Sequence, residues 1–202
     1  SRVEERDYYP ASSAQKRLYL QYQFEDAGLS YNMPGVIKIE GELDKVQVEE
    51  AFIKLVDRHE TLRTSFHMID GEIVQRIDQD LEFEVETLQV EGDQLEAIIE
   101  DFVRPFNLKE APLLRVGLAE LTEEEHVLFF DMHHIISDGT SMDILIREFA
   151  ALYQGQQLPE LAIQYKDFST WQNRIFEDDL MGDQEKYWLD TFSGEIPILN
   201  LP

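Results

Sequence analysis

The sequence predicts an α/β domain, a layered sandwich in which helices flank a mixed sheet. Segments whose apolar residues recur at i, i+3, i+4 and i+7 alternate along the chain with short segments of strand-like alternation. Long helices interleaved with strands favour a layered domain over a barrel or a helix bundle. The 202 residues, 43% of them hydrophobic, are enough to bury one substantial core.

Two amphipathic helices are expected in the first third of the chain. Residues 14–24 place Leu18 and Tyr22 about one turn apart, after a pair of serines that can cap the helix. Residues 43–60 contain a longer apolar stripe at the same spacing, with charged residues on the opposite face.

Three strands are expected around and after the second helix. Glycines bracket an alternating segment at 35–41. Asp70 and Gly71 lie between two apolar runs in 65–77, which predicts a hairpin because both turn positions favour positive φ. A further strand is expected at 81–86.

The remainder of the chain is expected to contain two strands and four helices. The strands are expected at 113–118 and 126–132, and the helices at 95–103, at 141–154, from about residue 165, and at 184–192. The closing segment has two prolines and no clear period, which is typical of a connector.

Composition excludes several classes of function. Lys and Arg number 17 against 42 Asp and Glu, and the net charge of −25 argues against nucleic acid as a partner. Without cysteine there is no disulfide, thiolate nucleophile or cysteine-ligated zinc. No apolar run approaches the ~18 residues of a membrane span, and the first residues are too charged for a secretory signal, so a cytoplasmic location is expected. Neither common phosphate-binding glycine motif occurs.

The segment most suggestive of chemistry is VLFFDMHHIISDGTS, at 127–141, where an apolar strand runs into two histidines. Imidazole is a natural general base at cellular pH. Adjacent strand residues point to opposite faces, so one of His133 and His134 should face the core and the other a cleft. Three other interpretations remain open at this point: a metal site, a triad built on Ser137, and two structural histidines.

Asp138 and Gly139 follow the histidines and suggest a supporting role. The carboxylate can accept local backbone N–H groups or meet an arginine, and glycine permits a sharp backbone and close approach of a substrate. Upstream, the segment 58–66 supplies Arg58 and Arg63. These either offset the helix dipole or turn inward to hold an acid.

Four segments together resemble a known family. They are SSAQKRLYL at 12–20, RHETLRTSF at 58–66, MHHIISDGTS at 132–141 and YKDFSTW at 165–171. They look like the first four core motifs of nonribosomal peptide synthetase condensation domains. The resemblance implies a chloramphenicol-acetyltransferase-like lobe: residues 1–180 as the N-terminal lobe, and 181–202 as a helix and connector to an absent C-terminal lobe.

The resemblance also implies an activity and the roles of individual residues. Such domains join two acyl groups, each held as a thioester on the 4′-phosphopantetheine of a carrier protein, into an amide. His134 would act on the acceptor amine as the catalytic residue. His133 would pack inward, and Asp138 would be structural, paired with an arginine. Gly139 would line the passage near the thioester.

The remaining implications concern the support of the lobe and its partners. Arg58, Arg63, Trp171 and Tyr165 would support the lobe, although simple core packing is the plainer interpretation of the two aromatic residues. No intrinsic cofactor or metal is expected. The expected partners are donor and acceptor peptidyl carrier proteins, the C-terminal lobe and an adenylation domain. The isolated lobe is expected to be inactive in condensation. Two alternatives remain: an epimerisation domain of the same superfamily, and a non-catalytic docking lobe.

Overall fold

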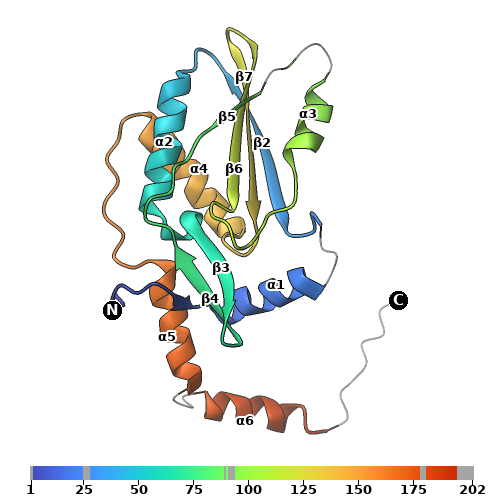
Figure 1. Cartoon of the computed structure of the whole chain (residues 1–202), viewed down its shortest axis with the longest axis vertical. Coiled ribbons are helices and arrows are strands. Elements are labelled where there is room, and N and C mark those ends of the chain that lie inside the picture. The colour runs from blue at the N-terminus through green and yellow to red at the C-terminus, as the bar shows by residue number, and fades with distance from the viewer. Residues whose placement is uncertain (1, 25–27, 89, 91–93, 178–180, 195–202) are drawn as a thin grey trace.

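The computed structural model describes residues 2–24, 28–88, 90, 94–177 and 181–194 (Figure 1). The helices are α1 (Ser13–Phe24), α2 (Lys45–Arg58), the 3₁₀ helix η1 (Glu60–Arg63), α3 (Leu95–Phe102), α4 (Gly139–Tyr153), α5 (Tyr165–Glu177) and α6 (Gly182–Thr191). The strands are β1 (Tyr9–Pro10), β2 (Asn32–Glu40), β3 (Thr64–Ile69), β4 (Glu72–Ile77), β5 (Glu86–Leu88), β6 (Leu114–Thr122) and β7 (Glu125–His133).

These strands form two sheets. The larger has the order β2-β7-β6-β5, with β5 parallel to β6 and the other pairs antiparallel. Helices α2 and α4 lie together along one side of this sheet and α3 lies on the other (Figure 1). The smaller sheet has the order β1-β4-β3 and lies beside α1 and α5 (Figure 1). The expected mixed sheet flanked by helices is therefore confirmed.

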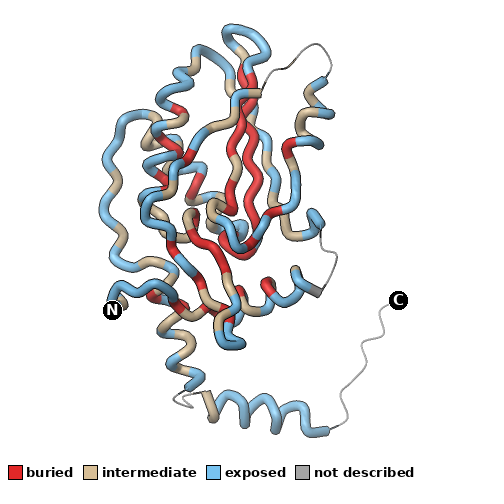
Figure 2. The backbone as a smooth tube through the Cα atoms, viewed as in Figure 1, coloured by how far each residue is buried: buried red, intermediate tan, exposed pale blue. Residues whose placement is uncertain are grey.

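Strand β7 is buried along nearly its whole length, because both of its faces are covered (Figure 2). Leu128 and Met132 point into the main core, whereas Val127 and Phe129 pack against α3. Each such side chain contributes roughly 1.5–3 kcal/mol when fully buried. Burial on both faces fixes the position of the C-terminal end of β7, where the histidines follow.

Strand β2 is an outer strand of the larger sheet and is paired throughout with β7. Gly35 lies opposite Phe130, and a Cβ atom at this position would stand 1.9 Å from the phenyl ring. The absence of a side chain at Gly35 therefore makes room for the ring of Phe130.

The hairpin and the helices agree with expectation, whereas one strand does not. Asp70 and Gly71 have φ values of 51° and 85°, so the two-residue turn is confirmed. The strand expected at 81–86 is wrong. Residues 81–85 belong to no strand, and only Glu86–Leu88 pair, in parallel with β6. Phe83 is buried nonetheless, so its apolar character reflects core packing rather than sheet pairing.

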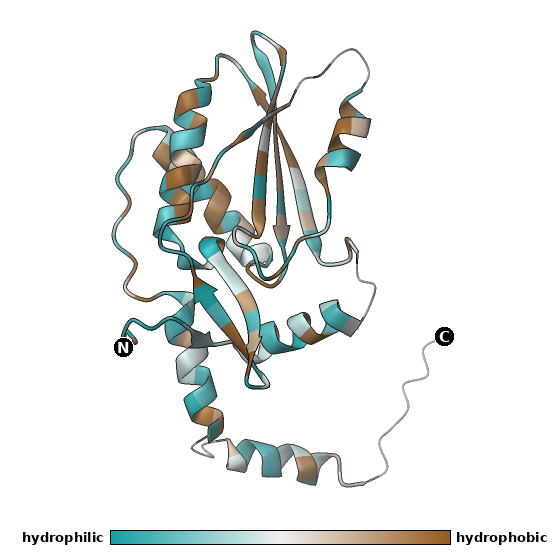
Figure 3. Ribbon diagram, viewed as in Figure 1, coloured by the Kyte–Doolittle hydropathy of each residue, from teal (hydrophilic) through white to brown (hydrophobic). Residues whose placement is uncertain are grey.

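Helix α5 begins beside the smaller sheet and runs away from it toward α6 (Figures 1 and 3). Both helices carry exposed apolar side chains. The largest of these are Phe168, Trp171, Phe176, Tyr187, Trp188, Leu189 and Phe192. The connector expected at the end of the chain falls mainly on residues 195–202, outside the described residues. Within the described part, no helix has the length and apolar character needed to cross a bilayer.

Candidate functional site

The candidate site is built on the loop that joins β7 to α4. Strand β7 ends at His133, residues 134–136 form a turn, and α4 begins at Gly139. The loop is closed by backbone contacts, since the Ile136 amide donates to the carbonyl of His133 at 3.1 Å. The two histidines therefore stand on a short segment with little freedom.

His133 packs inward, as expected, and its exposed fraction is 0%. Its Nδ1 accepts a hydrogen bond from the Ile135 amide at 3.0 Å, which places the ring proton on Nε2. The ring meets Tyr22 edge-on at 4.9 Å between centroids, with Tyr31 and Phe106 also close by. Burial, and secondarily the neighbouring His134, lower the pKa of His133 to about 4. His133 is thus a neutral structural residue.

His134 points out of the core and is exposed. Its Nδ1 lies 2.6 Å from the carbonyl oxygen of Ser137. A carbonyl can only accept, so Nδ1 carries the proton and donates it, and Nε2 is left with a free lone pair. The loop therefore fixes both the orientation and the tautomer of this imidazole, as a general base requires.

A cleft of about 270 Å³ opens beside His134. The expected site residues Asp138 and Tyr165 line it together with His134, and Arg17 of α1 contributes a positive charge. The Tyr165 hydroxyl lies 2.9 Å from Ser12 Oγ, which links the beginning of α5 to the segment before α1. The structure thus brings together parts of the first, third and fourth motif segments.

Asp138 is the N-cap of α4. Its Oδ1 accepts hydrogen bonds from the Ser141 amide at 2.8 Å and the Ser141 hydroxyl at 2.7 Å, and these bonds lower the pKa of the carboxyl. The structural role is in keeping with this geometry. The expected arginine is wrong for the described residues: Asp138 is exposed and forms no ion pair among them. A short N-cap carboxylate at the surface is satisfied by its own helix.

Gly139 is the first residue of α4 and has no positive φ. A Cβ atom placed there would meet nothing within 4 Å. The sharp backbone that glycine would permit is therefore not found at Gly139, whereas close approach of a substrate stays a prediction.

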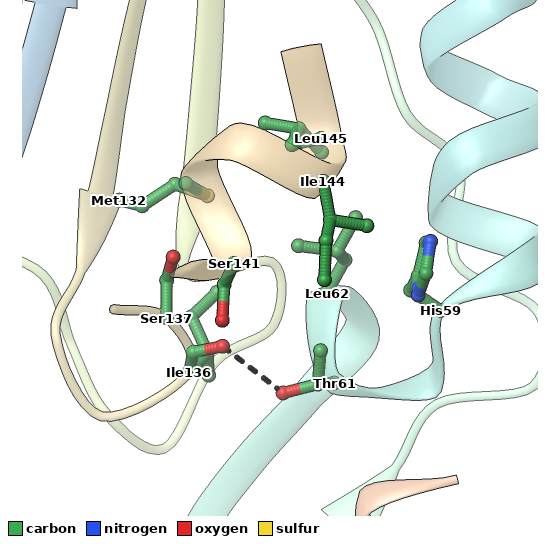
Figure 4. Close-up of a pocket in the computed structure, with 9 residues that line it drawn as sticks. All are labelled: His59, Thr61, Leu62, Met132, Ile136, Ser137, Ser141, Ile144 and Leu145. Carbon is green, nitrogen blue, oxygen red and sulfur yellow. Dashed lines mark hydrogen bonds between the residues drawn. The ribbon is translucent and has the colours of Figure 1, made fainter. Parts of the chain in front are cut away.

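The second motif segment reaches the site through η1. The Thr61 hydroxyl donates to the carbonyl of Ile136 at 3.2 Å, which ties η1 to the histidine loop (Figure 4). Arg58 turns inward and holds an acid, which was one of the two interpretations of this residue. Its Nε lies 3.0 Å from Glu148 of α4, and His59 Nε2 lies 2.6 Å from the same carboxylate. These contacts hold the end of α2 against α4.

Two other expected residues lie away from the cleft lining. Arg63 donates to the Asp78 carbonyl at 2.7 Å and to the Gln79 side chain, so it holds the end of the β3–β4 hairpin. Trp171 is 57% exposed, which excludes the core-packing interpretation within the described structure, and its ring lies 5.9 Å from that of Phe168.

Sequence reasoning missed a smaller cavity of about 100 Å³ next to the cleft. It lies between η1 and the first turns of α4 (Figure 4). Leu62, Ile144 and Leu145 form its apolar walls, and His59 stands at one side. The motif at 58–66 was the available signal, because three of its positions line this cavity. Among the described residues no cluster of three His, Asp or Glu side chains could hold a metal ion.

Comparison with known proteins agrees with this geometry. The family profile described as "Condensation domain" matches residues 5–202. Gramicidin S synthase 2 of Aneurinibacillus migulanus is 53% identical over 195 residues, which cover 96% of this chain and 4% of that protein. Tyrocidine synthase 3 of Brevibacillus parabrevis is 52% identical over 196 residues, which cover 97% of this chain and 3% of that protein.

Solved structures show the same fold. The X-domain from teicoplanin biosynthesis, in its complex with OxyB, superposes with a TM-score of 0.86 at 26% identity, covering 99% of this chain and 46% of that one. The starter condensation domain of rhizomide synthetase RzmA superposes with a TM-score of 0.80 at 23% identity, covering 95% of this chain and 51% of that one. The chain thus spans about half of these structures and a small fraction of the synthases. Because one profile accounts for residues 5–202 and the curated relatives exceed 50% identity, the chain belongs to the condensation-domain family and corresponds to the N-terminal part of such a domain.

Proposed function

We propose that this chain is the part of a nonribosomal peptide synthetase condensation domain that carries the catalytic histidine. The observation that carries the proposal is the anchored imidazole of His134. Its Nδ1 is held by the Ser137 carbonyl at 2.6 Å, which leaves Nε2 as the free nitrogen of an exposed ring that lines a cleft. The reaction is formation of a peptide bond between two carrier-bound groups.

The chemistry requires one proton to be managed and two substrates to be positioned. The acceptor α-amine attacks the carbonyl carbon of the donor thioester, the carbon–sulfur bond breaks, and the products are an amide and a free thiol. His134 Nε2 accepts the proton that the amine loses and can return one to the departing sulfur. A thioester is already activated, so proximity and a single base supply most of the required rate.

Both substrates arrive as thioesters on the 4′-phosphopantetheine of carrier proteins. The partners are a donor and an acceptor peptidyl carrier protein, a C-terminal lobe that completes the tunnel, and an adenylation domain in the same cytoplasmic synthetase. The exposed aromatic residues of α5 and α6 support a packing surface for the missing lobe. Since this chain supplies one wall of the cleft, we expect the isolated 202 residues to be inactive.

The test is product formation by the full-length parent synthetase. His134→Ala should lower the rate of dipeptidyl-thioester formation by at least ~100-fold, the usual contribution of a general base being roughly 10²–10⁴-fold. His67→Ala is the matched control, because this imidazole lies on β3, outside the cleft. It should retain the wild-type rate.

Three outcomes separate the proposal from its alternatives. A near-wild-type rate for His134→Ala would exclude the histidine as a base. Inversion of the α-carbon of a carrier-bound residue without amide formation would favour an epimerisation domain. Carrier binding with neither reaction would favour a docking lobe.

A further inference from the structure

We propose that the 100 Å³ cavity between η1 and α4 receives the side chain of the acceptor aminoacyl group. This inference rests on the proposed condensation function and deepens it, because it assigns a ligand to a cavity that the catalytic scheme does not use. The ligand class is a small to medium aliphatic side chain.

The walls of the cavity determine the class of side chain. Leu62, Ile144 and Leu145 make the surface mainly apolar, and in Figure 4 the Ile144 and Leu62 side chains point into the same space. Engineered apolar cavities of about 150 Å³ hold a benzene molecule. A volume of about 100 Å³ therefore fits a group of roughly valine to leucine size, whereas an indole would not enter.

The mouth of the cavity connects it to the histidine cleft. Four residues line both spaces, namely Thr61, Ile136, Ser137 and Ser141. They belong to η1, the histidine loop and the first turn of α4, so the cavity opens where the imidazole stands. The side chain of a substrate bound in that cleft can therefore reach the cavity directly.

The position of the amine selects the acceptor over the donor. A base must lie within roughly 2.6–3.2 Å of the nitrogen from which it takes a proton. The acceptor Cα is bonded directly to that nitrogen, whereas the donor Cα is separated from it by the reacting carbonyl carbon. The side chain nearer to His134, and hence to the shared mouth, is that of the acceptor.

The walls are held at a fixed spacing, as discrimination by size requires. His59 and Arg58 both contact Glu148 of α4, at 2.6 and 3.0 Å, which joins the η1 side to the α4 side. The Thr61 bond to the Ile136 carbonyl adds a third connection at the mouth. A cavity that cannot widen rejects side chains larger than its volume.

The experiment changes the cavity volume in both directions in the full-length parent synthetase. Ile144→Phe fills the cavity and Ile144→Ala enlarges it. Ile146→Phe is the matched control, since Ile146 is exposed on the same helix and lies outside the cavity lining. The donor carrier keeps one acyl group throughout, and the acceptor carrier is loaded in turn with glycine, alanine, leucine and phenylalanine.

We expect Ile144→Phe to lower the leucine-to-glycine ratio of condensation rates by at least ~10-fold, because one misfitted methylene changes discrimination by about 10- to 200-fold. Ile144→Ala should raise the phenylalanine-to-leucine ratio, and Ile146→Phe should leave both ratios at wild type. Unchanged ratios, or an equal loss for every acceptor, would overturn the inference. If the wild type forms no product with any pair, the proposed function fails as well, which distinguishes the two failures.

Discussion

The buried imidazole of His133 should make the stability of the chain depend on pH. In the folded chain the pKa of His133 is lowered to about 4, first by burial and then by the neighbouring His134. In the unfolded chain the ring is hydrated and titrates near its ordinary value of about 6.5. As pH falls, the unfolded chain therefore binds a proton that the folded chain does not, and the free energy of unfolding decreases.

The magnitude follows from the two pKa values. At about 1.4 kcal/mol per pKa unit, the full effect is about 3 kcal/mol, lost progressively as pH falls from about 6.5 through 4. Between pH 7 and pH 5 the unfolded chain takes up about three-quarters of a proton, while the folded chain remains mostly neutral. This interval accounts for about 2 kcal/mol.

Urea unfolding at pH 7, 6 and 5 measures the effect, with His133→Gln as the perturbation. The glutamine does not titrate, so the wild type should lose about 2 kcal/mol more than the variant between pH 7 and pH 5. Carboxylates contribute equally to both proteins and cancel in this difference. Parallel curves for wild type and His133→Gln would refute the reasoning.

Three further predictions concern the helix N-caps, the contact between Gly35 and Phe130, and the activity of the chain alone. Asp138→Ala should lower the free energy of unfolding by about 1 kcal/mol in urea melts, and so should Asp44→Ala at the N-cap of α2. Asp138→Asn should keep most of the stability that the cap provides. A loss above about 3 kcal/mol for Asp138→Ala would instead indicate a buried ion pair. Gly35→Ala should lower the melting temperature and cost about 1–3 kcal/mol, because the new methyl group would overlap the Phe130 ring; an unchanged melting temperature would show that the ring relaxes freely. The 202 residues alone should form no dipeptidyl thioester from loaded carrier proteins, and addition of a separately expressed C-terminal lobe should restore product formation. Turnover by the chain alone would contradict the need for two lobes.

Local patterns predicted most of the fold, and non-local pairing accounts for the errors. The apolar stripe of α2 and the Asp70-Gly71 turn are properties of short segments, and both are confirmed. Strand β5 is only three residues long and pairs in parallel with β6. Parallel pairing leaves no turn signal in the sequence, and the buried Phe83 just before it produced a false alternation.

In the candidate site, too, the features set by local sequence were predicted and the contacts between distant segments were not. The opposite environments of His133 and His134 followed from strand geometry alone. Of the two roles expected for Asp138, the bond from a local backbone N–H is found, whereas the arginine that the family resemblance implied is not found among the described residues. The Glu148 contacts join residues about 90 positions apart, and such a contact has no trace in a single sequence.

Strand β2 has consequences for how the isolated chain associates. An outer strand with free backbone groups can template the addition of identical strands, which is how amyloid fibres grow. The exposed positions of β2 are Pro34, Val36, Lys38 and Glu40, and the opposite edge of the sheet is the short β5. Proline has no N–H to extend the ladder, and charged side chains on an outer strand hinder the addition of further strands. Copies of the chain should therefore meet through the aromatic side chains of α5 and α6, in assemblies that dissolve on dilution rather than in fibres.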